Sequence, residues 1–242
     1  MSTVPPLNPE LVEELLIGNK IIYKYGVVDG FGHISVRHDK DPNYYVMSHH
    51  LAPPLVKEAD LITFDRDSNP VDGVPGRRYY SERYIHGEIY KARPEVNSVI
   101  HSHALSLLPF GVTKQKLLPM YHMSAFLGSG APVFEIREKA GMTNMLIRTP
   151  ELGKALADKL GPAPVIMMRG HGATMVGATI RAAVYRSIYA MQNATAQMDA
   201  IKIGDGDVTY LDPQEAELYD KYSAEVMHRP WNMWRAEALG EI

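Results

Sequence analysis

The segment that most restricts the fold of this chain covers residues 98–104 and reads Ser-Val-Ile-His-Ser-His-Ala. Its apolar start predicts a buried β-strand, and we expect this strand to end in two histidines, His101 and His103. Side chains two positions apart on a strand point to the same face, with their Cα atoms roughly 6.5–7 Å apart. Two imidazoles in this arrangement can bind one metal ion, and a strand is a rigid support for such a site.

Two further residues are candidates for the same site as the histidine pair. His171 lies between two glycines after the apolar run at residues 164–168, where the chain can approach a ligand closely. His101, His103 and His171 form a candidate metal triad, and three neutral histidines leave coordination positions open, as catalytic sites do. Glu82 begins a predicted helix. It is a candidate acid/base group or displaceable fourth ligand, although a carboxylate there could simply favour the helix N-terminus.

The composition excludes several classes of protein. A net charge of −3, with no basic stripe, argues against nucleic-acid binding. No apolar run approaches the roughly 18 residues of a membrane span. The N-terminus lacks the pattern of a secretory signal, so we expect a cytoplasmic protein. The chain has no cysteine, which excludes disulfides and leaves His, Asp and Glu as the candidate metal ligands.

Strand and helix patterns alternate along the chain, without an internal repeat or a linker. Besides the strand at 98–104, the pattern predicts strands over 31–37, 44–48, 60–65, 132–136 and 164–168. It predicts helices over 11–25, 82–91, 149–160 and 180–201, and a short helix near 213–222. Ser81 is expected to cap the second helix. We therefore expect one α/β domain over 1–242, with residues 211–242 as a C-terminal tail.

Polar side chains near the predicted strand ends are candidates for binding substrate. Those that could hold an anion are His33, Ser48, His49 and His50. Arg37 and Arg78 could each clamp a carboxylate, but could equally form structural ion pairs. His122 lies in a loop between apolar residues, which suits a pocket wall, a proton donor or a core position.

Taken together, these residues resemble the class II aldolase/adducin family. The resemblance covers nearly the whole chain, up to Tyr210. It rests on Gly32-His-Ile-Ser-Val-Arg37, Ser81-Glu82, Val99-Ile-His-Ser-His103 and Gly170-His-Gly172 in this order. It implies a three-layer α/β/α single domain with a central, mainly antiparallel sheet, and a homotetramer. It also implies one divalent metal ion per subunit, held by His101, His103 and His171, with Glu82 as the acid/base group.

The chain also departs from the sugar-phosphate aldolases of this family, which usually cradle phosphate with small residues. Here the corresponding positions are Gly32-His33, Ser48-His49-His50 and Tyr80-Ser81, whose rings would fill a phosphate nest. The chain is more similar to the branch with 3-hydroxy-2-methylpyridine-4,5-dicarboxylate decarboxylase and dihydroxyphthalate decarboxylase. Segments 51–54, 86–90 and 168–174 carry this resemblance. It implies a lyase that acts on hydroxylated aromatic acids, in aromatic compound catabolism.

We therefore expect a metal-dependent carbon–carbon lyase that decarboxylates a hydroxylated aromatic mono- or dicarboxylic acid through a metal-stabilised, enolate-like intermediate. Two alternatives stay open: an aldolase for an unphosphorylated hydroxy-keto acid, and a non-catalytic, adducin-like interaction module. The complete set of three histidines and Glu82 argues against the second. Manganese or zinc is the expected ion, with iron or cobalt as further candidates. The segment around Trp231 and Trp234 is a candidate for contacting a neighbouring subunit.

Overall fold

Seven strands form one sheet in the order β3-β2-β1-β4-β7-β6-β5 in the computed structural model, which describes residues 4–242. Neighbouring strands pair antiparallel, except for β5 and β6, which are parallel. The strands are β1 His33–Arg37, β2 Tyr44–Ser48, β3 Leu61–Asp65, β4 Ser98–Ser102, β5 Val133–Phe134, β6 Val165–Met168 and β7 Gly172–Gly177. The prediction of a mainly antiparallel sheet in an α/β domain is thus confirmed.

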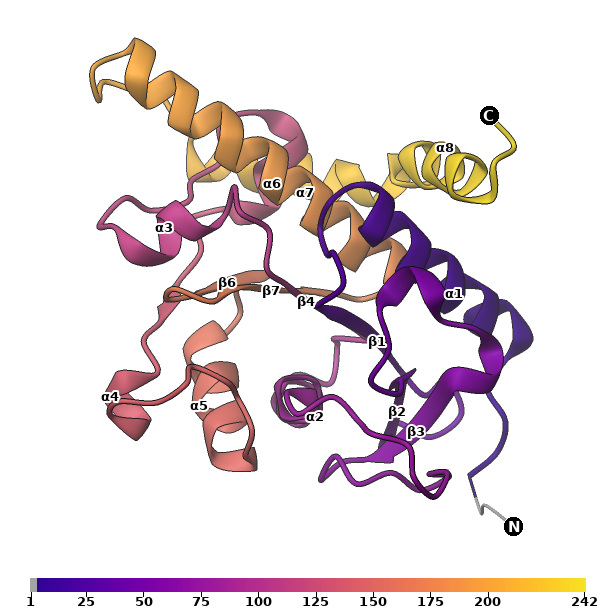
Figure 1. Ribbon diagram of the computed structural model, residues 1–242. Coiled ribbons are helices and arrows are strands. Elements are labelled where there is room, and N and C mark those ends of the chain that lie inside the picture. Colours follow the sequence, from indigo (N-terminus) through magenta and orange to yellow (C-terminus); the bar gives the residue numbers. More distant parts are fainter. Residues whose placement is uncertain (1–3) are drawn as a thin grey trace.

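Helices cover both faces of the sheet and complete the three predicted layers (Figure 1). On one face lie α1 Pro9–Lys24, α6 Ile180–Ile203, α7 Pro213–Val226 and α8 His228–Leu239. On the other lie α2 Arg83–Ala92, α4 Arg137–Ala140 and α5 Pro150–Leu160. Short helical segments are η1 Pro53–Leu55, η2 Glu58–Asp60, α3 Leu108–Val112 and η3 His122–Leu127. None of the helices in residues 4–242 is long and apolar enough to cross a membrane.

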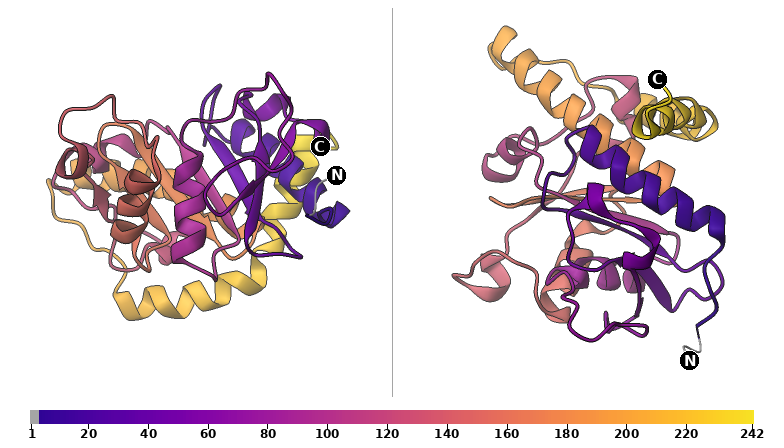
Figure 2. Two further views of the ribbon diagram at one scale, coloured as in Figure 1. Left: turned by 90° about the horizontal axis from the view of Figure 1, so that it is seen from below. Right: turned by 45° about the vertical axis from the view of Figure 1, so that its right-hand side comes forward.

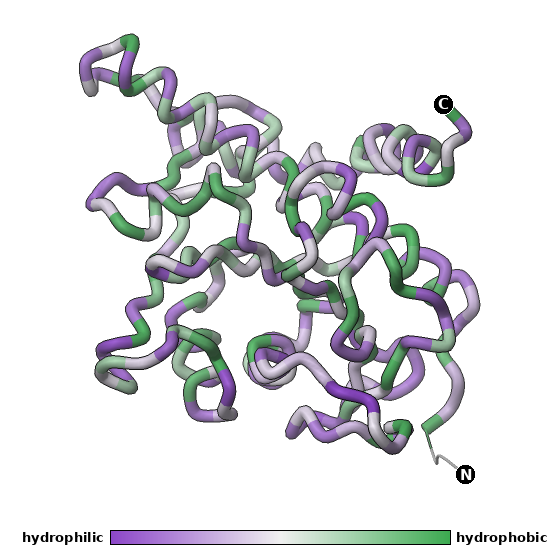
Figure 3. Tube along the Cα trace, in the orientation of Figure 1, coloured by the Kyte–Doolittle hydropathy of each residue, from purple (hydrophilic) through white to green (hydrophobic). Residues whose placement is uncertain are grey.

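Each face of the sheet buries its own apolar cluster. Successive side chains of a strand point to opposite faces. In β4, Ile100 accordingly joins the cluster under α1 and α6, whereas Val99 joins the cluster under α2 and α5. The helices turn one apolar side to these clusters, so hydrophobic and hydrophilic residues alternate along their traces (Figure 3). His101 shares the face of Val99, and β4 therefore directs it toward the layer that contains α2.

The structure differs from the sequence predictions at several element ends. β4 ends at Ser102, so His103 lies just beyond the strand. The N-cap of α2 is Glu82 and makes no side-chain capping bond, so the expected cap at Ser81 is wrong. Neither β7 nor α8 was predicted, and β5 has two residues instead of five. Glycines at both ends of β7 weaken its strand pattern, because glycine has little strand propensity.

The C-terminal helices pack against the rest of the chain. Figure 2 shows α8, in yellow, beside α1, in indigo, and the two helices are in contact. Trp231 and Trp234 are each 2% exposed and belong to the cluster under α1 and α6. Tyr25 of α1 bonds Glu237 of α8 at 2.5 Å. The two tryptophans therefore serve the core of this chain, and other side chains of 211–242 would have to make the predicted contact with a neighbouring subunit.

Candidate metal centre

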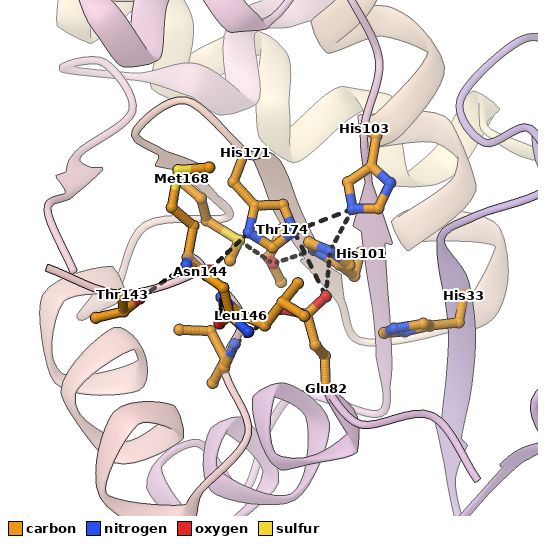
Figure 4. A network of polar contacts seen from close by, with 12 residues as sticks. His33, Glu82, His101, His103, Thr143, Asn144, Leu146, Met168, His171 and Thr174 are labelled. Atoms are coloured by element: carbon orange, nitrogen blue, oxygen red, sulfur yellow. Dashed lines mark hydrogen bonds and ion pairs between the residues drawn. The ribbon is translucent and has the colours of Figure 1, made fainter. Parts of the chain in front are cut away.

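Four side chains from three parts of the chain converge at one end of β4 (Figure 4). They are Glu82 at the start of α2, His101 in β4, His103 just after it, and His171 in the turn between β6 and β7. The Nε2 atom of His103 lies 3.0 Å from Nε2 of His101 and 3.1 Å from Nε2 of His171. Glu82 Oε2 lies 3.5 and 3.4 Å from Nε2 of His101 and His171. The four ligand atoms lie within 4.8 Å of one another.

A close approach between β7 and β4 brings His171 to the pair on β4. Gly172 begins β7 and pairs with Met168 across the turn. A Cβ atom at Gly172 would lie only 2.0 Å from the Ser102 carbonyl oxygen, so only glycine fits there. Gly170 has a φ of 65°, in the left-handed region that favours glycine. The structure thus requires glycine on both sides of His171, at Gly172 because of the close contact and at Gly170 because of the positive φ.

Hydrogen bonds behind the cluster orient its ligand atoms. The Nδ1 atom of His171 lies 2.9 Å from the Met145 carbonyl oxygen, which can only accept, so this nitrogen carries a proton and Nε2 has the lone pair of the neutral imidazole. Thr174, opposite His101 across β4 and β7, places Oγ1 3.4 Å from Nδ1 of His101. The Ile147 backbone N–H donates to Glu82 Oε1 at 2.9 Å. Such outer contacts are typical of metal sites, where they fix ring orientation.

The donor set fits a divalent cation. With Nδ1 of neutral His171 protonated, its Nε2 lone pair and Glu82 Oε2 are two acceptors 3.4 Å apart, and a cation bound between them would satisfy both. Burial, followed by the charges of His101 and His171, lowers the pKa of His103 to about 4, so this imidazole is neutral at neutral pH, as a ligand must be. Three imidazoles and one carboxylate suit zinc, manganese, iron or cobalt.

Glu82 is a carboxylate in this environment. Burial alone would raise the pKa of Glu82, but hydrogen bonds and charges from His101 and His171 lower it well below its usual range. Conversely, burial disfavours protonated His171, and the hydrogen bond and charge of Glu82 outweigh it, so the pKa of His171 is raised. Glu82 therefore holds negative charge beside the three histidines, where it can ligate a cation or accept a proton.

A cavity of about 310 Å³ opens beside Glu82 and His103. Its walls are largely made of rings and apolar groups, among them Phe31, His33, Leu51 and Tyr80. The rings of His33 and Tyr80 stand 4.5 Å apart. Arg148 also lines the cavity; it is exposed and has no ion-pair partner in the part of the chain that the structure describes. The cavity thus combines flat walls, a candidate metal centre and one unpaired cation.

The structure brings only some of the predicted substrate-binding residues to this cavity. His33 and His50 line it. Ser48 is buried behind it, 3.2 Å from the Tyr80 hydroxyl, and His49 instead bonds Asp60 at 3.2 Å. Arg78 is exposed, and its backbone carbonyl accepts a hydrogen bond from the His50 N–H at 2.9 Å.

Arg37 and His122 lie away from the cavity. The Arg37 guanidinium is buried and donates to four backbone carbonyls, including those of Val96 and Tyr90, so it has a structural role at the far end of β1 and its expected role as a carboxylate clamp is wrong. His122 is exposed on the other side of the sheet, with its ring 4.7 Å from that of Tyr219. In this chain it cannot reach the metal centre.

The sequence predicts no cavity-wall role for Arg148, Phe31 or Tyr80. The available signal at Tyr80 is its bulk, since it replaces a small residue before Ser81-Glu82. Arg148 lies in a loop without a motif, one residue after Ile147, whose N–H holds Glu82. Its place in the cavity depends on the path of this loop, which no local pattern indicates.

Comparisons with known proteins agree with this arrangement. Residues 13–198 match the model of the Class II Aldolase and Adducin N-terminal domain. The chain is 35% identical over 248 residues to Decarboxylase tropJ of Talaromyces stipitatus, covering 93% of each chain. It is 23% identical to 3,4-dihydroxyphthalate decarboxylase of Arthrobacter keyseri, covering 86% of each. The fold superimposes on L-fuculose 1-phosphate aldolase from Glaciozyma antarctica with a TM-score of 0.77 and 23% identity, covering 99% of this chain and 96% of the other.

Proposed function

We propose that this chain, which belongs to the class II aldolase and adducin family, is a metal-dependent lyase that decarboxylates a hydroxylated aromatic acid. The observation that carries the proposal is the cluster of three histidines and Glu82 at the edge of a ring-walled cavity. The similarity to decarboxylases supports the type of reaction. We further propose one divalent ion per subunit, with manganese or zinc ahead of iron or cobalt.

The cavity walls favour a planar substrate over a sugar phosphate. At about 310 Å³ the cavity is at the lower end of the range for small-molecule sites, which suits a single substituted ring. His33 and Tyr80 fill the wall where small residues would have to bind phosphate. Arg148 and His50 line the same cavity and offer hydrogen-bond donors to a substrate carboxylate. A hydroxylated aromatic dicarboxylate matches both features.

His101, His103 and His171 would hold the ion, with Glu82 as a ligand that substrate can displace. When bound, a divalent ion there supplies Lewis acidity, which withdraws charge from an adjacent substrate oxygen. The residues of the chain then have to bind the ring, orient the carboxylate that leaves, and move one proton.

Glu82 is the residue that moves this proton. Decarboxylation breaks the bond between a ring carbon and the carboxylate carbon, and the electron pair stays on the ring until a proton replaces CO2. Because Glu82 is ionised, it can take the proton of an entering phenol and return it to the ring carbon; Glu82 is then ionised again, and the product leaves as a phenolate that takes its proton from water. Its bond from the Ile147 N–H keeps one oxygen in place during both transfers.

The predicted homotetramer, the cytoplasmic location and the contact of residues 211–242 with a neighbouring subunit remain proposals. His122 could supply a proton only if a second copy of the chain carried it to this cavity. An aromatic carboxylate is the small-molecule partner that we propose for the site.

The test is to incubate metal-analysed protein with a panel of hydroxylated aromatic mono- and dicarboxylic acids, including 3,4-dihydroxyphthalate, and to measure CO2. We expect release that a chelator stops and that added manganese or zinc restores. A new aldehyde or ketone from hydroxy-keto acids, without CO2, would move the assignment to an aldolase. A protein that neither takes up metal nor turns over any substrate would be the non-catalytic interaction module.

A further inference from the structure

A chain of buried hydrogen bonds leads from the cavity wall into the layer under α2. His33 Nδ1 lies 2.7 Å from His86 Nε2, and His86 Nδ1 lies 2.6 Å from Ser35 Oγ. Ser35 Oγ in turn lies 2.7 Å from the Tyr90 hydroxyl. All four residues are buried, with exposed fractions of 4% or less.

Regular secondary structure sets this chain of four residues. His33 and Ser35 are two apart on β1 and so point to the same face of the sheet. His86 and Tyr90 are four apart on α2 and so lie one above the other on the helix surface. The contact between one strand and one helix therefore fixes three successive hydrogen bonds, and only His33 reaches the cavity.

The direction of the protons along this chain is decided at the Tyr90 end. At 2.7 Å only one of the two facing ring nitrogens, His33 Nδ1 or His86 Nε2, can carry a proton, and the contact of 2.6 Å between His86 Nδ1 and Ser35 Oγ likewise holds one proton. His86 therefore either donates to His33 and accepts from Ser35, or accepts from His33 and donates to Ser35. In residues 4–242 the Tyr90 hydroxyl has no acceptor other than Ser35 Oγ, and Ser35 Oγ contacts only His86 and Tyr90.

Only one direction satisfies the buried phenol. If Tyr90 donates to Ser35, then Ser35 donates to His86 Nδ1, and His86 Nε2–H donates to His33 Nδ1. If His86 instead donates to Ser35, the hydroxyl protons of Ser35 and Tyr90 share a single contact, and one of the two is buried without an acceptor, which disfavours that arrangement roughly 5- to 150-fold. His33 therefore carries its proton on Nε2, the ring nitrogen that has no partner in the described part of the chain.

We propose that this buried chain locks His33 in the tautomer that presents Nε2–H to the cavity, as a donor to an anionic oxygen of the substrate. Figure 4 shows His33 pointing from its strand toward Glu82 and His101. His33 is then a catalytic residue, and His86, Ser35 and Tyr90 are positioning residues. The identity of the oxygen, a phenolate or carboxylate of an aromatic acid, rests on the proposed function.

The tautomer decides whether this wall of the cavity attracts or repels the substrate. An N–H fixed in place before the reaction stabilises charge that develops on an oxygen, because it needs no reorganisation. The other tautomer would direct a lone pair at the same oxygen. The ring of His33 is also held between those of Tyr80 and His101, at centroid distances of 4.5 and 5.1 Å, so it cannot turn aside easily.

The first test reads the tautomer directly. In zinc-loaded protein labelled with ¹⁵N at histidine, NMR distinguishes a protonated from an unprotonated ring nitrogen, and His33→Asn identifies the His33 signals by their loss. We expect Nε2 protonated and Nδ1 unprotonated in the wild-type protein. The reverse assignment would overturn the inference, and the result does not depend on whether the protein decarboxylates anything.

The second test uses two isosteric variants of His86. The amide of His86→Gln can accept from Ser35 and donate to His33, which preserves the tautomer. The carboxylate of His86→Glu can only accept, so it requires a proton on His33 Nδ1, and the two variants are compared at a pH at which NMR shows a single proton on the His33 ring. The probe is 3,4-dihydroxybenzoate, the monocarboxylate that 3,4-dihydroxyphthalate gives on losing the carboxylate beside its hydroxyl. We expect zinc-loaded His86→Glu to bind it roughly 10- to 100-fold more weakly than His86→Gln, with the NMR tautomer reversed.

Each outcome bears on a different claim. Equal affinities in the two variants, with the tautomer reversed in only one, would refute the role of His33 as a donor to the ligand. If His86→Glu does not fold, the wild-type tautomer still decides the direction of the chain. If the tautomer is confirmed but the protein releases no CO2 from any acid tested, the proposed function is refuted and the inferred direction of the hydrogen bonds still holds.

Discussion

Replacing Glu82 by glutamine removes one negative charge and keeps the shape of the side chain. Glu82 Oε1 accepts the Ile147 N–H at 2.9 Å, and a glutamine carbonyl can accept the same bond. The loop that carries Ile147 should therefore stay in place. The three imidazoles remain available, so we expect the variant to bind one ion per chain, with affinity lowered roughly 10- to 100-fold.

The effect on turnover should be larger than the effect on metal binding. A side chain that transfers a proton in the transition state contributes roughly 10²- to 10⁴-fold, or about 3–5 kcal/mol of the barrier. An amide cannot take up the phenol proton and return it to the ring carbon. At saturating metal, kcat for CO2 release should therefore fall by roughly 10²–10⁴ in Glu82→Gln.

The assay combines CO2 release with metal analysis of the same sample. Glu95→Gln is a matched control, since Glu95 is largely exposed and pairs with Arg93 outside the cavity that contains Glu82. Turnover in the control should equal that of the wild-type protein. Full activity of Glu82→Gln with metal bound would refute the role of Glu82 in proton transfer.

Three further substitutions test other parts of the structure. Arg148→Met should raise KM for a dicarboxylate roughly 5- to 30-fold and leave kcat nearly unchanged, because an exposed, charge-assisted hydrogen bond contributes about 1–2 kcal/mol to binding. An unchanged KM would exclude Arg148 from the substrate site. Gly172→Ala should lower the unfolding free energy by about 1–3 kcal/mol, or Tm by roughly 2–12 °C, because the added methyl group would clash with the Ser102 carbonyl oxygen. Gly30→Ala is the control and should be as stable as the wild type, because its methyl group would have no atom within 4 Å. Burial, then the charge of His101, lowers the pKa of His86 to about 3. As pH falls from about 6.5, the unfolded chain therefore takes up a proton that the folded chain does not, and the unfolding free energy drops by up to about 1.4 kcal/mol per pH unit. Denaturant titrations of His86→Gln should show a smaller change of unfolding free energy with pH between about pH 6.5 and 3.

Local sequence motifs identified the four residues of the metal centre, but they did not predict the strand β7 that brings His171 to His101 and His103. The apolar strand that carries His101, the glycines around His171 and the helix that begins at Glu82 are local patterns, and each has a direct counterpart in the structure. The sheet contact between β4 and β7 then leaves these side chains little freedom. The roles of the four residues remain a prediction, but their convergence follows from local signals and one strand pairing.

The substrate side of the cavity could not be predicted in the same way. Arg37 and Arg148 are both arginines near polar segments, yet one is buried against backbone carbonyls and the other faces the cavity. What separates them is tertiary: Arg37 ends β1 against the turn after α2, whereas the loop before α5 carries Arg148 to the cavity. No property of either residue or its sequence neighbours contains this information.

His33 and Tyr80 also explain why the wall of this cavity must differ from a phosphate cradle at more than one position. A buried imidazole needs hydrogen-bond partners, because an unsatisfied buried polar group costs about 1–3 kcal/mol. At His33 this partner is His86, whose own second nitrogen is satisfied by Ser35. A His33→Ala change alone would therefore leave His86 Nε2–H without its acceptor. Converting this site toward phosphate binding would require a coordinated change on β1 and α2, and the single change should lower stability before it broadens the substrate range.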